Sequence, residues 1–451
     1  MNPLLDGVLF RDVFTTKEMR TVFGETAFVD RFLEVEAALA RAEAEIGIVP
    51  EDAATTITNH ASVASIDMAD VAANVDKLGL FSMSILEAWT DELGPAGEYV
   101  HWGASTQDVS DTAMVLLLRD AHEVLLRDVV AVRDQLATLA DQYRETPMVG
   151  RTQYANGPPV TFGLKAATWV DELDRHVSRL LNIEEQLFVA QLAGASGTLS
   201  ALGDDGIQVL DLFADELDLG VPRVGWTASR DRFAAFLNVL ALVARTLARI
   251  AREILFLNRP EIDELEETVP EDELGSSTNP HKENPVFSQH TVGLARLVRS
   301  HAGTMHECLE SMGERDRSAW YVEFALLPES CCYLARMLEN TNRNLDGLTV
   351  RSNQMDRNLR ASGALVLSEA VLFALARHVG RQTAHSILHK NAMRAVQSDR
   401  DFLACLKADD RVTDHLSEAQ LESLVDPDNY TGLAEPFVDR VLDGLTDLGD
   451  P

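Results

Sequence analysis

Apolar residues recur along this chain mostly at spacings of three and four, the period of an amphipathic helix. In the first long example, covering about 27–48, one stripe carries Phe32, Val35, Leu39, Ala42 and Ile46, and Pro50 follows. Further long helices are predicted at about 112–143, 160–192, 232–258, 286–312 and 328–345. No segment alternates in the manner of a β-strand. The pattern therefore predicts an all-α fold.

The length of these helices indicates how they pack. A helix of about 30 residues spans about 45 Å, so several of them are expected to lie side by side as a bundle. The segment 232–257 is apolar nearly all round, which is typical of a helix buried inside a bundle or an oligomer. Charged residues interrupt it, so we interpret it as a core helix and not a membrane span. These are Arg245, Arg249, Arg252 and Glu253.

The chain is expected to have three parts. An N-terminal helical domain at 1–110 precedes the long-helix bundle at 111–350, and shorter helices form a small domain at 351–451. His101–Asp111, at the end of the first part, is interpreted as a loop in which Ser110 or Asp111 caps the next helix.

The net charge of −33 restricts the partners of the protein. Lysine occurs only at Lys17, Lys77, Lys165, Lys282, Lys390 and Lys407. An acidic, lysine-poor surface suits a high-salt cytosol, where charges are strongly screened. Nucleic acids and anionic membranes would be repelled. A site for an anionic substrate must therefore gather Arg, Lys and His locally.

The cysteines and the start of the chain suggest a compartment. No metal-ligand spacing is visible among Cys308, Cys331, Cys332 and Cys405. No signal peptide is recognisable either. We therefore expect a reduced, cytoplasmic environment and no metal.

The strongest local signal is Gly275-Ser276-Ser277-Thr278-Asn279-Pro280-His281-Lys282-Glu283-Asn284-Pro285. Glycine permits backbone conformations closed to other residues, and the prolines keep the loop from becoming helix. Lys282 and the amides at the helix start near Pro285 can hold a carboxylate. The alternative is a plain polar turn, which does not explain so much specialised chemistry between two core helices.

This segment resembles the signature loop of the fumarase/aspartase superfamily, G-S-S-x-x-P-x-K-x-N. The resemblance implies that Ser276 is the base that removes a proton next to a carboxylate, and that Lys282 and Asn284 bind substrate carboxylates. Family members most often have methionine at the position of Asn279. A serine is a poor base unless its alkoxide is stabilised, so Lys282, loop amides and exclusion of water would have to lower its pKa.

A second segment, His101-Trp102-Gly103-Ala104-Ser105-Thr106-Gln107-Asp108, resembles the first motif of the family. The hydroxyl pair is reversed here, as Ser105 followed by Thr106. The resemblance implies that these hydroxyls hold a substrate carboxylate and that His101 donates a hydrogen bond or a proton. Without the resemblance, His101 beside Trp102 would be read as a residue that packs the loop.

A third segment runs from Gly150-Arg151-Thr152-Gln153-Tyr154 through Pro158 to Gly163 and resembles the second motif. Adenylosuccinate lyases carry a general-acid histidine at the position of Gln153. Glutamine cannot titrate, so that role is vacant here. Arg151, Thr152 and Gln153 are candidate substrate contacts, although Arg151 can also be explained as a helix-end salt bridge.

The resemblance extends over nearly the whole chain and adds arginine candidates. Arg230 lies in Trp226–Arg232 at the start of the most apolar helix, where it binds either substrate or Asp231 in a structural ion pair. Arg315 lies in the charged segment Glu314–Trp320 and could reach a site across a subunit interface.

The resemblance implies an all-α fumarase/aspartase fold that oligomerises through its bundle, an aci-carboxylate intermediate, and a homotetramer with shared active sites. No cofactor is called for. Of the functions in the family, we expect a cycloisomerase that converts 3-carboxy-cis,cis-muconate to a muconolactone in aromatic-acid breakdown, because its reaction protonates no amine. The alternatives are adenylosuccinate lyase or a related C–N or C–O lyase, and a catalytically inactive helical scaffold.

Overall fold

The computed structural model describes residues 7–267, 279 and 283–446. Two compact units divide the chain. Unit 1 comprises the described residues up to Val129, with His176–Leu247 and Gly293–Glu339, and unit 2 comprises the rest. Because this division follows packing and not chain order, it does not test the predicted three-part division at residues 110 and 350.

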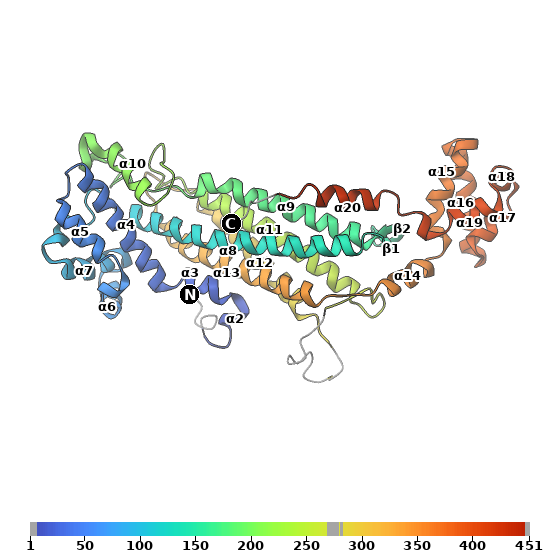
Figure 1. The fold of residues 1–451 in the computed structure, drawn as a ribbon, viewed down its shortest axis with the longest axis horizontal. Coiled ribbons are helices and arrows are strands. Elements are labelled where there is room, and N and C mark those ends of the chain that lie inside the picture. The colour runs from blue at the N-terminus through green and yellow to red at the C-terminus, as the bar shows by residue number, and fades with distance from the viewer. Residues whose placement is uncertain (1–6, 268–278, 280–282, 447–451) are drawn as a thin grey trace. The chain divides into compact units, whose positions relative to one another are not determined.

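The long helices are those that the apolar periodicity predicts. They are α8 (Thr106–Gln142), α9 (Phe162–Leu187), α11 (Asp231–Leu257), α12 (Val286–Glu307) and α13 (Arg317–Gly347) (Figure 1). Each of them contributes one part to unit 1 and the other part to unit 2. The prediction of a mostly helical fold built on long helices is confirmed.

The other elements of unit 1 are short helices before α8 and between α9 and α11. They are α2 (Arg11–Phe14), α3 (Lys17–Val22), α4 (Glu25–Glu45), α5 (Glu51–Asn59), η1 (Val63–Ser65), α6 (Met68–Leu78), α7 (Phe81–Leu93), η2 (Gly94–Tyr99), η3 (Ser200–Asp205) and α10 (Gly206–Glu216). Helix α4 is the predicted helix at 27–48, and it packs on α5 and α10. Its buried face carries the predicted residues Phe32, Val35, Leu39 and Ala42, and also Glu36 and Glu43.

Helix α13 begins earlier than the predicted start at Pro328, which lies inside the helix. Proline removes one backbone hydrogen bond, so it normally marks a helix start or a kink. Here aromatic packing in unit 1 holds the turns before it: the Phe324 and Phe28 rings lie 5.6 Å apart, and the Trp320 and Phe81 rings 5.5 Å apart. Tertiary packing outweighs the local signal.

Unit 2 contains a β-hairpin, which corrects the prediction that the chain has no strands. Strands β1 (Pro147–Thr152) and β2 (Ala155–Thr161) pair antiparallel, with a register irregularity at Val149/Gly150. A Cβ atom at Gly150 would lie 2.2 Å from the Pro158 carbonyl oxygen, so only glycine fits there. The prolines and glycines that permit this bulge also interrupt the alternation of apolar and polar residues by which a strand is recognised in a sequence.

The remaining elements of unit 2 are a short ladder and a group of small helices. Strands β3 (Leu265–Glu266) and β4 (Thr349–Val350) form the ladder. The helices are α14 (Ser352–Ala361), η4 (Ala364–Leu367), α15 (Ser368–Val379), α16 (Arg381–Ser398), α17 (Phe402–Lys407), α18 (Asp410–Thr413), α19 (Glu418–Leu424), η5 (Pro427–Asn429) and α20 (Ala434–Leu442). Helices α15 to α19 enclose a core of their own around Val371, Leu388 and Leu406.

Helix α11 has the apolar surface that the sequence indicates. Within the described residues it is a helix long and apolar enough to cross a membrane, with a mean hydropathy of 1.6 over its most apolar stretch. Of that stretch, 56% is buried inside the protein, as in a core helix. The exposed remainder includes Leu242, of which 45% is accessible.

Candidate active site

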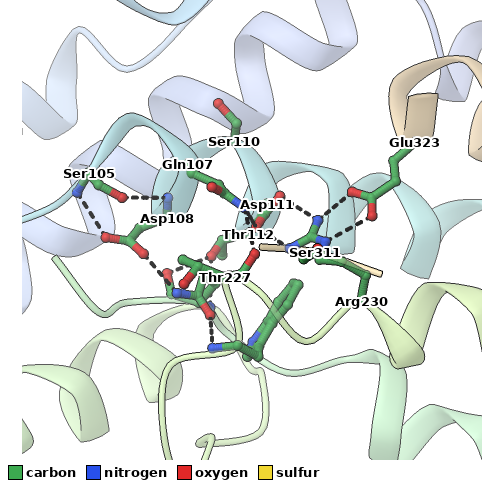
Figure 2. A network of polar contacts seen from close by, with 12 residues as sticks. Ser105, Gln107, Asp108, Ser110, Asp111, Thr112, Thr227, Arg230, Ser311 and Glu323 are labelled. Carbon is green, nitrogen blue, oxygen red and sulfur yellow. Dashed lines mark hydrogen bonds and ion pairs between the residues drawn. The ribbon is translucent and has the colours of Figure 1, made fainter. Parts of the chain in front are cut away.

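The first motif forms the start of helix α8. The backbone N–H of Ser105 donates to the Asp108 carboxylate (2.8 Å), and the backbone N–H of Asp108 donates to the Ser105 hydroxyl (3.2 Å) (Figure 2). This reciprocal pair is a capping box. The helix therefore begins at Thr106, and the prediction of a loop up to Asp111, capped by Ser110 or Asp111, is wrong. The sequence signal for this capping box is Ser105 followed three residues later by the acidic Asp108.

Asp108 ties this motif to a distant segment of unit 1. Its carboxylate also accepts from the Gly194 backbone N–H (2.9 Å) and from the Gln191 side-chain amide (2.8 Å). Gln191 in turn accepts from the backbone N–H of Trp226 (2.7 Å). Burial raises the pKa of Asp108, and these hydrogen bonds oppose that rise. One buried carboxylate thus orders the segments that flank the first motif.

Arg230 lies at the centre of a buried ion-pair network, with its guanidinium between Asp111 and Glu323 (Figure 2). Four hydrogen bonds of 2.5–3.0 Å join it to these carboxylates, and its cation stacks 5.1 Å from the Trp226 ring. Burial disfavours its charge, but the two carboxylates raise its pKa overall. The alternative of a structural ion pair was correct in kind but not in partner, because the partners are Asp111 and Glu323 and not Asp231. Four of the five N–H donors of Arg230 are engaged by these carboxylates.

Arg315 lies beside the same segments but remains exposed. Its guanidinium donates to the Gly194 carbonyl oxygen (2.9 Å). The Thr227 hydroxyl donates to the neighbouring carbonyl of Glu314 (2.9 Å). Unit 1 therefore brings Arg315, an exposed residue, to the loops around the start of α8.

His101 is held by a carboxylate from α4. Its Nδ1 donates to Oε1 of the fully buried Glu36 at 2.6 Å. Burial disfavours the charged imidazolium, but Glu36, with a smaller contribution from Asp108, raises the pKa of His101 overall. The His101 side chain is 20% exposed, and its Nε2 has no hydrogen-bond partner among the described residues. The arrangement favours the protonated ring, in which Nε2–H is a donor open to a ligand.

The backbone around His101 is tightly specified. His101 has a φ of 61° and Gly103 a φ of 71°, both in the left-handed region. A Cβ atom at Gly103 would lie 2.7 Å from the Leu202 side chain. The turn between His101 and Ser105 therefore requires Gly103, and the segment around Leu202 packs against it.

Next to this turn, the N-terminus of α8 offers donors for an anion. The backbone N–H groups of Thr106 and Gln107 make no hydrogen bond within the described part of the chain. The Thr106 hydroxyl is half-buried, whereas the Ser105 hydroxyl is buried and already accepts from Asp108. The positive end of a long helix and these donors favour a carboxylate.

The second motif occupies the hairpin of unit 2. Thr152 pairs with Ala155, so Gln153 and Tyr154 form the two-residue turn, with φ of 51° and 66°. These angles are those of a type I′ turn, which usually carries Asn or Gly. Thr152, Gln153 and Tyr154 are all exposed. The hairpin thus presents Gln153 at its tip, where no described residue covers it.

Arg151 does not end a helix but lies in β1, bound to Glu264. Its guanidinium makes two hydrogen bonds to the Glu264 carboxylate, of 2.9 and 2.6 Å. Asn358 donates to the same carboxylate (2.9 Å). A cavity of about 360 Å³ borders Arg151 and is lined also by Asn156, Phe256 and Ser362. The pairing with Glu264 makes Arg151 a support of the hairpin.

The start of helix α12, which follows the signature loop, is occupied by a carboxylate of the chain itself. Glu267 accepts from the backbone N–H groups of Phe287 (2.7 Å) and Ser288 (3.1 Å). Asn344 also donates to it (2.9 Å). The expectation that these amides bind a substrate carboxylate is therefore wrong. Ser276 and Lys282 lie outside the described residues, and Asn284 directly precedes the network.

The predicted site residues fall into two groups. Unit 1 holds His101, Ser105, Thr106, Arg230 and Arg315, and unit 2 holds Arg151, Thr152, Gln153 and Asn284. The sequence reasoning missed the supporting carboxylates Glu36, Asp108 and Glu267. In the sequence these residues appear only as acids on an apolar helix face or next to a helix cap. Such positions gain meaning only when the long-range contacts are known.

Family models and known proteins match this chain over most of its length. A family model described as "Lyase" matches residues 12–299, and one described as "Adenylosuccinate lyase C-terminus" matches residues 364–441. An N-acetyl-S-(2-succino)cysteine lyase of Enterococcus italicus is 39% identical over 97% of this chain and 96% of its own. A 3-carboxy-cis,cis-muconate cycloisomerase of Pseudomonas aeruginosa is 37% identical over 96% and 95%. The crystal structure of a fumarate lyase from Mesorhizobium sp. BNC1 matches with a TM-score of 0.90 and 38% identity, covering 96% of this chain and 98% of that one.

Proposed function

The chain belongs to the fumarase/aspartase lyase superfamily, and from that premise we propose that it cleaves a succinyl thioether into fumarate and a thiol. In this reaction a base removes a proton from the CH2 carbon next to one carboxylate. The resulting aci-carboxylate collapses to the C=C bond of fumarate, and the C–S bond breaks with its electron pair on sulfur.

Gln153 is the observation that separates this proposal from the lyases that release an amine. An amine leaving group needs a proton from a general acid, and an amide side chain has none to give. A cysteine-type thiolate, whose conjugate acid has a pKa of about 8.5, departs as an anion near neutral pH. Gln153 at the exposed hairpin tip is therefore compatible with a thiol leaving group and unfavourable for an amine. The similarity to N-acetyl-S-(2-succino)cysteine lyase along almost the whole chain supports the same choice.

We assign roles to the site residues as follows. Ser276 is the base, and Lys282 and Asn284 hold the carboxylate whose charge grows as the proton leaves. The His101 imidazolium, Thr106 and the first amides of α8 bind the other carboxylate, with Ser105 supporting the turn and Arg315 adding positive charge at its edge. Thr152 and Gln153 contact the thioether side, and Arg151 steadies their hairpin through Glu264. Electrostatic stabilisation of this kind supplies most of such a rate enhancement.

A second candidate is the cycloisomerase reaction on 3-carboxy-cis,cis-muconate. A carboxylate oxygen adds across a double bond of the same molecule, and the carbanion that forms is then protonated. Here too the group that adds or leaves is an anion, so Gln153 is equally acceptable. The similarity to the Pseudomonas aeruginosa enzyme supports this reading. Adenylosuccinate lyase is disfavoured, because its leaving group is an amine.

We also propose that the protein is a cytoplasmic homotetramer in which chains share active sites. The exposed Leu242 of α11 and the exposed hairpin tip are available for such contacts. Sedimentation at high salt is expected to give the mass of several chains. A mass of one chain in an active preparation would contradict the proposal.

Progress curves on three substrates test the function. Purified protein in molar salt is given N-acetyl-S-(2-succino)cysteine, 3-carboxy-cis,cis-muconate and adenylosuccinate in separate assays. We expect equal release of fumarate and thiol from the first, lowered about 10²- to 10⁴-fold in Ser276→Ala because the base is lost. Ser386→Ala, at an exposed serine of α16, is the matched control and should be fully active.

The other outcomes are equally informative. Loss of muconate absorbance without thiol release would favour the cycloisomerase. Turnover of adenylosuccinate alone would contradict the argument from Gln153.

A further inference from the structure

Helix α4 carries two buried carboxylates on one face. Glu36 and Glu43 lie seven residues apart, close to two helical turns, so both point to the same side. Only 1% of Glu36 and none of Glu43 is exposed. Two ionised carboxylates in an apolar interior would be very costly. Each therefore needs a partner or a proton, and the two meet that need differently.

Glu36 has a cation as its partner. Its Oε1 accepts from Nδ1 of His101 at 2.6 Å, a short, charge-assisted hydrogen bond. The charged groups that face His101 are Glu36 from α4 and Asp108 from α8, and Glu43 is near enough to Glu36 to be repelled by its charge. Because one carboxylate oxygen fixes Nδ1, the imidazole can present only Nε2 to a ligand.

We propose that Glu36 is a positioning residue that holds the His101 imidazolium with Nε2 directed at the substrate carboxylate. This rests on the function proposed above, in which His101 binds that carboxylate. Glu36 fixes the ring orientation and supplies the negative charge that keeps the ring protonated. A histidine without it would be free to rotate and would lose its proton at lower pH.

Glu43 is the natural control, because it is buried on the same helix as Glu36 but has no cation as its partner among the described residues. Neither of its carboxylate oxygens has a hydrogen-bond partner among the described residues. Burial, with repulsion from Glu36, raises its pKa to about 9. It is therefore neutral at pH 7, and Glu43→Gln removes no charge there. The same substitution at two sites on one helix face separates the effect of charge beside His101 from the effect of altering the core of α4.

The test measures His101 directly. In protein labelled at histidine carbons, the His101 NMR signal, assigned by its absence in His101→Gln, is followed through a pH titration in wild type, Glu36→Gln, Glu36→Asp and Glu43→Gln. We expect Glu36→Gln to lower the pKa of His101, Glu36→Asp to restore it in part, and Glu43→Gln to leave it unchanged below pH 8. In steady-state assays, Glu36→Gln should lower kcat by roughly tenfold or more, and the alkaline limb of its pH profile should move to lower pH.

The inference is overturned if Glu36→Gln folds normally and leaves the His101 titration and the alkaline limb where they are in wild type. It is also overturned if Glu43→Gln reproduces both effects, because the role would then be structural. If Glu36→Gln fails to fold, Glu36→Asp decides by the same readouts. A shifted His101 titration in a protein that turns over none of the three substrates would instead refute the proposed function and leave the positioning role intact.

Discussion

The start of helix α8 in unit 1 and the β1–β2 hairpin in unit 2 each carry one of the family motifs, and their polar residues lie in opposite environments. At α8 the polar groups are buried and joined to partners from distant segments, as Asp108 and Arg230 show. At the hairpin tip, Gln153 and Tyr154 adopt unfavourable left-handed conformations and stay exposed. The motif at α8 is therefore held by long-range contacts within unit 1, whereas the motif at the hairpin tip of unit 2 is exposed.

The difference suggests a separate role for each motif. A buried, fully paired network fixes geometry before substrate arrives, and such preorganisation lowers the cost of stabilising charge in the transition state. A presented tip with two strained residues is a feature found at binding and interface sites. We therefore propose that the hairpin completes a site together with another copy of the chain.

The largest expected effect concerns the buried network. Arg230→Gln leaves the Asp111 and Glu323 carboxylates buried without their cation, so we expect it to lower the free energy of unfolding by about 3–5 kcal/mol. Arg175→Gln, which breaks the exposed Arg175–Asp171 pair, should cost less than about 1 kcal/mol. Denaturant unfolding in constant salt compares the two. Equal costs would mean that the network does not hold the start of α8.

A second effect depends on pH and accumulates over several pH units. The pKa of Glu43 is raised to about 9 from an ordinary value of 4.5, so its contribution to stability is complete below pH 4.5 and is lost as pH rises toward 9. Between these values the loss is about 1.4 kcal/mol per pH unit. Glu43→Gln should remove this slope, so the difference between variant and wild type should grow with pH. The prediction is contradicted if the free energies of unfolding of Glu43→Gln and wild type differ by the same amount at every pH from 5 to 9.

The smallest effect concerns the hairpin tip. The left-handed conformation costs Tyr154 about 1–2 kcal/mol, and glycine avoids this cost. Glycine loses about 0.5–1 kcal/mol through the larger entropy of its unfolded chain, so Tyr154→Gly should stabilise the protein by up to about 1 kcal/mol. Tyr154→Ala keeps the penalty and serves as the control. Thermal unfolding of both variants checks the comparison. If glycine destabilised the chain more than alanine did, the Tyr154 ring would have to make contacts that the exposed tip does not show.

The features of the fold that could be predicted from the sequence are those that depend on residues close together in the chain. The long helices and the signature segment were predicted because periodicity and motifs are local. The hairpin was missed because its glycines and prolines fit a bulge that is recognisable only once Gly150 faces Pro158. The start of α13 was missed because aromatic packing, and not the local chain, holds the turns before Pro328.

The site was predicted in the same uneven way. The motif residues could be placed on the chain, but their partners could not. Glu36 lies 65 residues from His101, and Asp108 lies 86 residues from Gly194, so no local pattern connects them. Arg230 was recognised as important, yet whether it binds substrate or carboxylates of the protein depends on residues far away in sequence.

Complementation between inactive variants tests most directly whether copies of the chain share the site. His101→Gln and Ser276→Ala are each purified, confirmed inactive, mixed in equal amounts, dissociated and reassembled in molar salt. If a site takes His101 and Ser276 from different chains, random assembly restores about a quarter of the wild-type activity. The same treatment of each variant alone should restore none. A mixture that sediments as mixed oligomers yet stays inactive would contradict the account, because both residues would then have to come from one chain.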